Sequence, residues 1–157
     1  MSDRICYLVM DVDGTLTDGR IYMSPSGEAM KAFSIKDGFG IHELLIPAGI
    51  KPVVITSRSS AIVLNRCQEL GIDAVYQGVG NKVEKLKGIT RELKSVAYIG
   101  DDINDLPIMK EVKEAGGLTG CPADAVESVR QFVDFVSKYD GGFGAVRDFI
   151  EWIIHLR

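Results

Sequence analysis

Two aspartates, Asp11 and Asp13, follow an apolar run and precede Gly14 in the stretch ICYLVMDVDGTLTDG at residues 5–19. An uncharged apolar run of this kind predicts a buried strand, and the glycine after the acids lets the backbone turn sharply. Ligands of open α/β sheets bind beyond the carboxyl ends of the strands, so these carboxylates stand where chemistry is expected. A lone D-x-D would more simply end a strand in a turn, and only polar groups elsewhere in the chain can favour a site.

Further polar groups follow two later strands. They are Thr56, Ser57 and Arg58 after residues 51–55, and Asp101, Asp102, Asn104 and Asp105 after residues 96–99. Lys82 opens the helix predicted at residues 82–93. Several carboxylates cannot stay ionised together without a cation, and oxygen ligands without cysteine or histidine select a hard ion such as Mg²⁺. Magnesium with one lysine and one hydroxyl describes a phosphate-binding site.

The elements that must position these groups alternate along the sequence. A hairpin is expected within residues 19–35, helical spacing follows at residues 39–47, 60–70, 82–93, 107–114, 123–132 and 145–156, and strands are expected at 51–55, 73–76, 96–99, 116–118 and 133–136. Alternating strands and helices give a parallel sheet with helices on both faces. We therefore expect residues 1–157 to form a single α/β domain, a Rossmann-like three-layer sandwich with a β-hairpin flap after the first strand.

Composition and local sequence patterns limit the kinds of binding partner and the cellular compartment that we expect. The net charge of -4 argues against nucleic acid or an anionic membrane as the main partner. The amino terminus lacks the pattern of a signal peptide, and no apolar run approaches the roughly 18 residues of a membrane span, so we expect a cytoplasmic protein. The three cysteines are far apart and odd in number, which predicts free thiols.

Four segments, DVDGTLTDG, ITSR, Lys82 and GDDIND, occur in this order and resemble the four motifs of the haloacid dehalogenase superfamily of phosphohydrolases. The resemblance implies Asp11 as the nucleophile that forms an aspartyl-phosphate, and Asp13 as the acid that protonates the leaving oxygen and then activates water. It also implies that Asp11, Asp101 and the backbone carbonyl of Asp13 hold Mg²⁺. Thr56 and Lys82 would hold phosphoryl oxygens.

The resemblance assigns supporting roles to other residues of the same motifs. Ser57 is expected beside the phosphate. Asp105 would lie behind the site and orient Lys82 or metal-bound water, with Asp102 and Asn104 around it. For Asp102 and Asp105 an alternative stays open, because acids are also favoured at a helix amino terminus by the helix dipole.

The spacing of the motifs leaves no room for the cap domain that many members of this superfamily insert. A site without a cap either accepts a macromolecule or is closed by a neighbouring subunit. The segments LTDGRIY, GEAMKAFSIKDGFGI and GGFGAVRD resemble the 3-deoxy-manno-octulosonate 8-phosphate (KDO 8-phosphate) phosphatase group of lipopolysaccharide biosynthesis. That resemblance implies a homotetramer whose hairpins and tails complete adjacent sites, with Lys36, Asp37 and Gly38 near the sugar and Arg147 reaching across an interface.

Arg58 bears on the identity of the sugar. In this group the equivalent position is an arginine in octulosonate phosphatases and an acid in the best-known nonulosonate enzyme, and an arginine can pair bidentately with a substrate carboxylate. The alternative is a solvated arginine at the start of a helix. Two departures from the group, Ser57 for the usual glycine and Ser59 where lysine is common, weaken the choice of sugar and not the phosphatase chemistry.

We therefore expect a Mg²⁺-dependent phosphomonoester hydrolase acting on KDO 8-phosphate through an aspartyl-phosphate. The alternatives are a nonulosonate (KDN or sialic acid) 9-phosphate phosphatase and a non-catalytic oligomerising module, against which the acids and Lys82 argue. A phosphatase acting on phosphoprotein or nucleic-acid ends would need basic or aromatic platforms that the sequence lacks. A signalling receiver domain would carry its acceptor aspartate on a middle strand.

Overall fold

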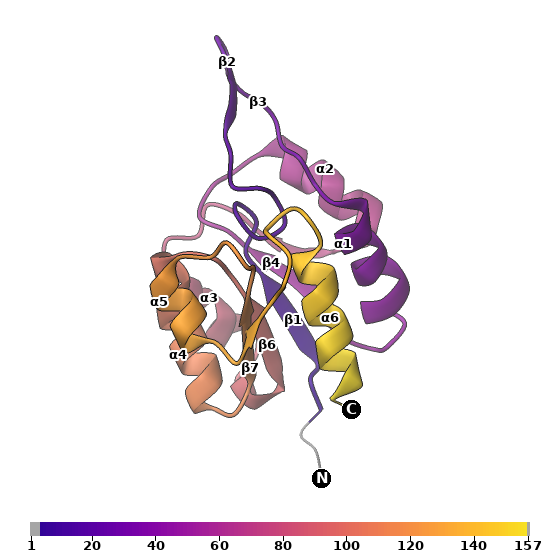
Figure 1. Ribbon diagram of the computed structural model, residues 1–157, viewed down its shortest axis with the longest axis vertical. Helices are drawn as coiled ribbons and strands as arrows, with labels where there is room; N and C mark the ends of the chain where they lie inside the picture. The colour runs from indigo at the N-terminus through magenta and orange to yellow at the C-terminus, as the bar shows by residue number, and fades with distance from the viewer. Residues whose placement is uncertain (1–3, 157) are drawn as a thin grey trace.

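The computed structural model describes residues 4–156 and is built around a sheet of six parallel strands (Figure 1). In spatial order the strands are β5 (Ala74–Tyr76), β4 (Lys51–Ile55), β1 (Tyr7–Met10), β6 (Val96–Ile99), β7 (Leu118–Cys121) and β8 (Phe135–Val136). The predicted parallel α/β sheet is confirmed.

Helices cover both faces of this sheet and complete three layers. One face carries α1 (Ile35–Phe39) with its π-helical continuation (Gly40–Leu45), α2 (Ala61–Leu70) and α6 (Ala145–His155), and the other carries α3 (Lys82–Ile89), α4 (Leu106–Glu114) and α5 (Glu127–Phe132). Side chains of β1 alternate between the two layers, since Leu8 and Met10 pack with Phe149 of α6, whereas Val9 packs with Met109 of α4. Because β1 is buried on both faces, its sequence is apolar throughout.

The predicted hairpin is also present. Strands β2 (Tyr22–Ser24) and β3 (Gly27–Met30) pair antiparallel and project from the carboxyl end of the sheet (Figure 1). A bridge between Thr17 and Phe33 closes the base of the hairpin. Among the described residues, the segments between the motifs contain this hairpin and single helices or strands, and no cap domain.

Several element boundaries differ from those predicted. The first helix begins at Ile35 instead of residue 39, because the hydroxyl of Ser34 accepts a hydrogen bond from the Lys36 amide and caps it. The helix predicted at residues 82–93 ends at Ile89, because the backbone of Thr90 is extended. No helix within residues 4–156 has the length and apolarity needed to cross a membrane.

The strand order places the site. From β1 the chain moves outward to β4 and then β5, and it returns to the opposite side of β1 at β6. The carboxyl ends of β1 and β6 therefore flank the point where the direction of winding reverses. Ligand sites of open α/β sheets form at such points.

Candidate active site

An open cavity of about 170 Å³ lies at the carboxyl ends of β1, β4 and β6. Its lining consists of Asp11, Asp13, Thr56, Ser57, Arg58, Asp101, Asp102 and Asn104. All of these residues were predicted from the motifs. Parallel pairing explains their convergence, because strands that start in register also end side by side, as Met10 does with Val54 and Ile99.

A sharp turn at Gly14 brings the first motif against Asp101. Gly14 has a φ of +86°, and a Cβ atom there would lie 2.0 Å from Oδ2 of Asp101. The Thr15 hydroxyl lies 3.4 Å from Oδ1 of the same carboxylate. A glycine is therefore required at position 14 by both the backbone conformation and the close approach of the acid.

Lys82 forms ion pairs with two acids of different motifs, Asp11 of the first and Asp105 of the fourth. Its ammonium lies 3.1 Å from Oδ1 of Asp11 and 2.9 Å from Oδ1 of Asp105, and its side chain is 5% exposed. Oδ1 of Asp105 also accepts a hydrogen bond of 2.5 Å from the Tyr98 hydroxyl, and Oδ2 accepts the backbone amides of Asp101 and Asp102. Asp105 thus contacts both Lys82 and the loop that carries Asp101, and it also forms a capping box with Asp102 at the start of the short helix Ile103–Asp105.

Crowding of carboxylates perturbs the site electrostatically. Burial, with the charge of Asp105, raises the pKa of Asp11 to about 6, although Lys82 opposes the rise. Burial and the neighbouring charge of Asp11 raise the pKa of Asp101 to about 8. A divalent cation would relieve this repulsion and return both groups to the charged form.

The donor set fits Mg²⁺. Oxygens of Asp11, Asp101 and Asp105 lie within 4.8 Å of one another. Both oxygens of Asp105 already accept hydrogen bonds from the protein, so Asp11 and Asp101 are the side chains available to a cation. Hard carboxylate oxygens, without a sulfur or imidazole ligand among them, suit magnesium.

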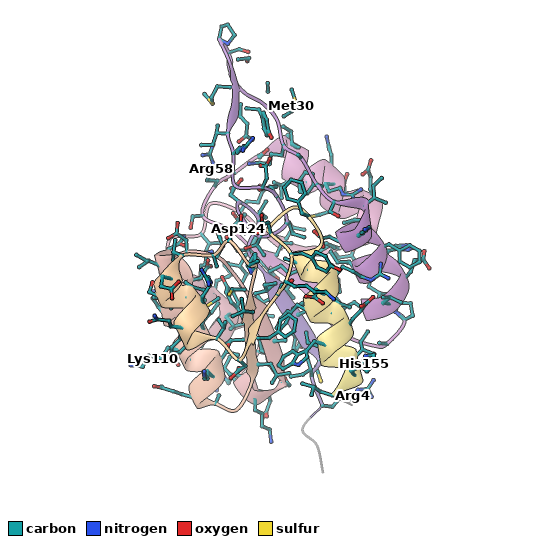
Figure 2. The ribbon with its side chains drawn as sticks, viewed as in Figure 1. Arg4, Met30, Arg58, Lys110, Asp124 and His155 are labelled. Atoms are coloured by element: carbon teal, nitrogen blue, oxygen red, sulfur yellow. The ribbon has the colours of Figure 1, made fainter. Side chains whose placement is uncertain are left out.

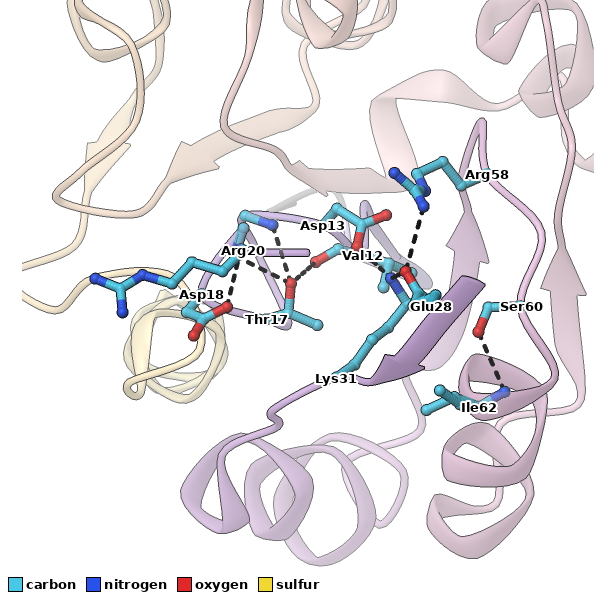
Figure 3. Close-up of polar contacts among 12 residues, drawn as sticks. Val12, Asp13, Thr17, Asp18, Arg20, Glu28, Lys31, Arg58, Ser60 and Ile62 are labelled. Carbon is cyan, nitrogen blue, oxygen red and sulfur yellow. Dashed lines mark hydrogen bonds and ion pairs between the residues drawn. The ribbon is translucent and has the colours of Figure 1, made fainter. Parts of the chain in front are cut away.

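Asp13 has a partner that sequence analysis did not identify. Lys31, directly after β3, donates to Oδ1 of Asp13 at 2.6 Å and to Oε2 of Glu28 at 3.0 Å. Arg58 approaches the same Glu28 oxygen at 3.3 Å, so positive and negative charges alternate from Arg58 through Glu28 and Lys31 to Asp13, and both ends of this series line the cavity (Figure 3). The only local signal was the three-residue spacing of Glu28 and Lys31. Tyr98 was also missed, although it is the one polar side chain in residues 96–99.

The three residues predicted near the sugar, and Arg147, which was predicted to reach across an interface, lie outside this cavity. Lys36 and Arg147 line a separate cavity of about 300 Å³ beside α6. Asp37 and Gly38 are buried, and Oδ1 of Asp37 accepts the Arg147 amide at 2.9 Å. The structure does not bring these residues together with Asp11. Their service to the site of a neighbouring subunit stays a prediction.

Comparison with known proteins places this geometry in a family. No protein-family model matches the sequence. The 3-deoxy-D-manno-octulosonate 8-phosphate phosphatase KdsC of Escherichia coli strain K12 is 38% identical over 157 residues, which cover 98% of this chain and 81% of that protein.

Solved structures agree with the sequence relationship. The 3-deoxy-D-manno-octulosonate 8-phosphate phosphatase of Moraxella catarrhalis, in complex with magnesium ion, phosphate ion and KDO, matches with a TM-score of 0.90 at 38% identity, covering 99% of this chain and 89% of that one. The cobalt-bound deoxy-D-mannose-octulosonate 8-phosphate phosphatase of Haemophilus influenzae matches with a TM-score of 0.87 at 36% identity, covering 98% and 89%. The chain therefore belongs to the KDO 8-phosphate phosphatase family of the haloacid dehalogenase superfamily.

Proposed function

We propose that this protein hydrolyses the phosphate monoester of KDO 8-phosphate in a Mg²⁺-dependent reaction. The observation that carries the proposal is the convergence of Asp11, Asp13, Thr56 and Asp101 on one cavity, with Lys82 beneath it. The M. catarrhalis relative, whose fold matches along nearly the whole chain, holds magnesium, phosphate and KDO.

In the first step, a carboxylate oxygen of Asp11 attacks phosphorus, and the bond from phosphorus to the sugar oxygen breaks. Asp13 gives its proton to that leaving oxygen. Bound Mg²⁺ would neutralise phosphoryl charge so that an anionic carboxylate can approach a phosphate dianion. Lys82 adds a second positive charge, and the hydroxyls of Thr56 and Ser57 hold phosphoryl oxygens in place.

In the second step, water attacks the aspartyl-phosphate. Asp13, now a carboxylate, takes a proton from that water, and the bond from phosphorus to the Asp11 oxygen breaks to release inorganic phosphate. Asp11 returns to its starting form. Asp13 thus needs to face first the leaving oxygen and then the water, while Asp105 keeps Lys82 in its place between the two carboxylates.

Arg58 supports the choice of an acidic sugar. Its side chain is 49% exposed at the rim of the cavity and carries a charge that a substrate carboxylate can meet bidentately. In the absence of substrate its partner is Glu28. A sugar carboxylate would replace Glu28 as the partner of the Arg58 guanidinium.

We further propose a homotetramer acting in the cytoplasm, where a charged sugar phosphate is retained. The open cavity and the projecting hairpin support it, because the hairpin exposes Ile21, Met23 and Met30 at 51%, 66% and 58%. Such apolar exposure favours burial against another subunit. In this arrangement Lys36, Gly38 and Arg147 would serve an adjacent site, and residues 1–157 would form one phosphohydrolase domain.

Phosphate release tests the proposal directly. The panel holds KDO 8-phosphate, KDN 9-phosphate, glucose 6-phosphate and a phosphopeptide, each with Mg²⁺ and with excess EDTA. We expect Mg²⁺-dependent release, preferentially from KDO 8-phosphate, and its loss in Asp11→Asn. The exposed Asp73→Asn serves as a matched control that keeps activity. Release in the presence of EDTA, or turnover by Asp11→Asn, would contradict the mechanism, and preference for KDN 9-phosphate would overturn the choice of sugar.

A further inference from the structure

The hairpin contributes a buried cation to the catalytic aspartate of its own chain. The side chain of Lys31 is 2% exposed, although it follows a strand that projects from the molecule. We propose that Lys31 is a positioning residue that holds the carboxylate of Asp13 in the orientation required for proton transfer. This inference rests on the proposed phosphatase function, in which Asp13 serves both steps.

The contact geometry restricts Asp13 strongly. Lys31 donates to Oδ1 of Asp13 at 2.6 Å, a short charge-assisted bond, and the remainder of the carboxylate lies in the cavity with 28% of the side chain exposed. With Oδ1 engaged, Oδ2 is the oxygen left to give and take the proton. Because Oδ1 can accept the ammonium whether or not Oδ2 carries a proton, the same contact serves both steps.

A second carboxylate keeps Lys31 itself in place. Glu28 accepts from the same ammonium at 3.0 Å, so Lys31 is fixed between two acids rather than free to follow one (Figure 3). A buried ammonium with two carboxylate partners is desolvated only because both are present. The pairing therefore fixes the base of the hairpin and the Asp13 side chain in one arrangement.

A structural role for Lys31 predicts a different kinetic result from a positioning role. If the pairing merely kept the hairpin attached, its loss would disturb every step and every substrate alike. If Lys31 acts through Asp13, its loss should affect the steps in which Asp13 transfers a proton. The leaving group separates these cases, since 4-nitrophenolate departs without a proton, whereas a sugar alkoxide needs one.

The test compares Lys31→Met with wild type on KDO 8-phosphate and on 4-nitrophenyl phosphate. We expect kcat for KDO 8-phosphate to fall about 100-fold, the usual consequence of a misplaced catalytic group. With 4-nitrophenyl phosphate, phosphorylation of Asp11 stays fast while its hydrolysis slows. Rapid mixing should then show a burst of about one nitrophenolate per site, an extent that reports accumulated aspartyl-phosphate.

Two further variants keep the test decisive. Lys110→Met is the matched control, because Lys110 is an exposed lysine of α4 remote from Arg58 (Figure 2). If Lys31→Met does not fold, Lys31→Arg preserves the charge but replaces the compact ammonium by a broad guanidinium, which displaces Asp13. The same burst is expected from it with a smaller fall in kcat. In an Asp13→Asn background, Lys31→Met should change the residual rate by less than about threefold.

The inference fails if folded Lys31→Met keeps the wild-type kcat on KDO 8-phosphate. It also fails if both substrates lose rate equally without a burst, or if Lys31→Met costs as much in Asp13→Asn as in wild type. In each of these cases wild type remains an active phosphatase. Absence of phosphate release by wild type itself would instead overturn the proposed function.

Discussion

Asp37 offers a sharp test of how burial competes with hydrogen bonding in this fold. The residue is 2% exposed, Oδ1 accepts the Arg147 amide at the start of α6, and Oδ2 has no hydrogen-bond partner within residues 4–156. Burial raises its pKa from 3.8 to about 6, against the backbone amides of α6, which favour the charged form. Asp37 therefore keeps its proton to a higher pH in the folded protein than in the unfolded chain.

The sign and size of the effect follow from linkage. Between pH 3.8 and about 6 the folded state binds more protons at Asp37 than the unfolded state, so stability falls as the pH rises. The contribution is fully present below the unfolded pKa of 3.8 and is lost as pH rises through the folded pKa of about 6. A difference of about two pKa units corresponds to about 3 kcal/mol.

Asp37→Asn isolates this contribution because asparagine does not titrate. Urea unfolding of both proteins from pH 4 to 7.5 can be followed by fluorescence of the single tryptophan, Trp152, which stacks on Phe149 within α6. We expect the free energy of unfolding of wild type, relative to Asp37→Asn, to fall by about 2.5 kcal/mol over this range, because a small part of the contribution is already lost at pH 4.

Exposed Asp73→Asn provides the control for the removal of one negative charge. A difference between wild type and Asp37→Asn that stays constant with pH, or grows as pH rises, would refute the reasoning. It would mean that the amides of α6 outweigh burial and that Asp37 is an ordinary charged helix cap.

Three further outcomes follow from the site. Gly14→Ala places a Cβ atom 2.0 Å from Oδ2 of Asp101, so we expect Mg²⁺ half-saturation of activity, measured by titration, to rise at least about tenfold. Lys82→Met leaves Asp11 and Asp105 without their cation, which should cost about 3–5 kcal/mol in urea unfolding as well as abolish turnover. Arg58→Met should raise KM for KDO 8-phosphate about 30-fold, the equivalent of about 2 kcal/mol, and leave KM for 4-nitrophenyl phosphate unchanged because that substrate lacks a carboxylate. An unchanged Mg²⁺ half-saturation in Gly14→Ala, an unchanged stability in Lys82→Met, or an unchanged KM for KDO 8-phosphate in Arg58→Met would contradict the contact assigned to that residue.

Local patterns predicted the elements whose ends are marked by specific residues. Helix α2 begins after the Ser60 cap and ends at Gly71, which has a φ of 76°, as expected from the sequence. Where the sequence has no such residue at the end of an element, the boundary in the structure differs from the predicted one. The helix predicted to begin at residue 123 begins at Glu127, because residues before it form a turn in which the Ala125 amide bonds to the Pro122 carbonyl.

The sequence by itself determined the sheet class and the residues that line the cavity. Asp11, Thr56 and Asp101 each lie within two residues of the end of a parallel strand, so alternation of strands and helices is enough to bring them to one edge. Tertiary structure alone decided which charges meet. Lys31 reaches Asp13 by the return of the hairpin, and Asp37 turns to the start of α6, 110 residues away, instead of the cavity. Such pairings depend on how the chain folds back in space, and neither periodicity nor spacing along the sequence records that path.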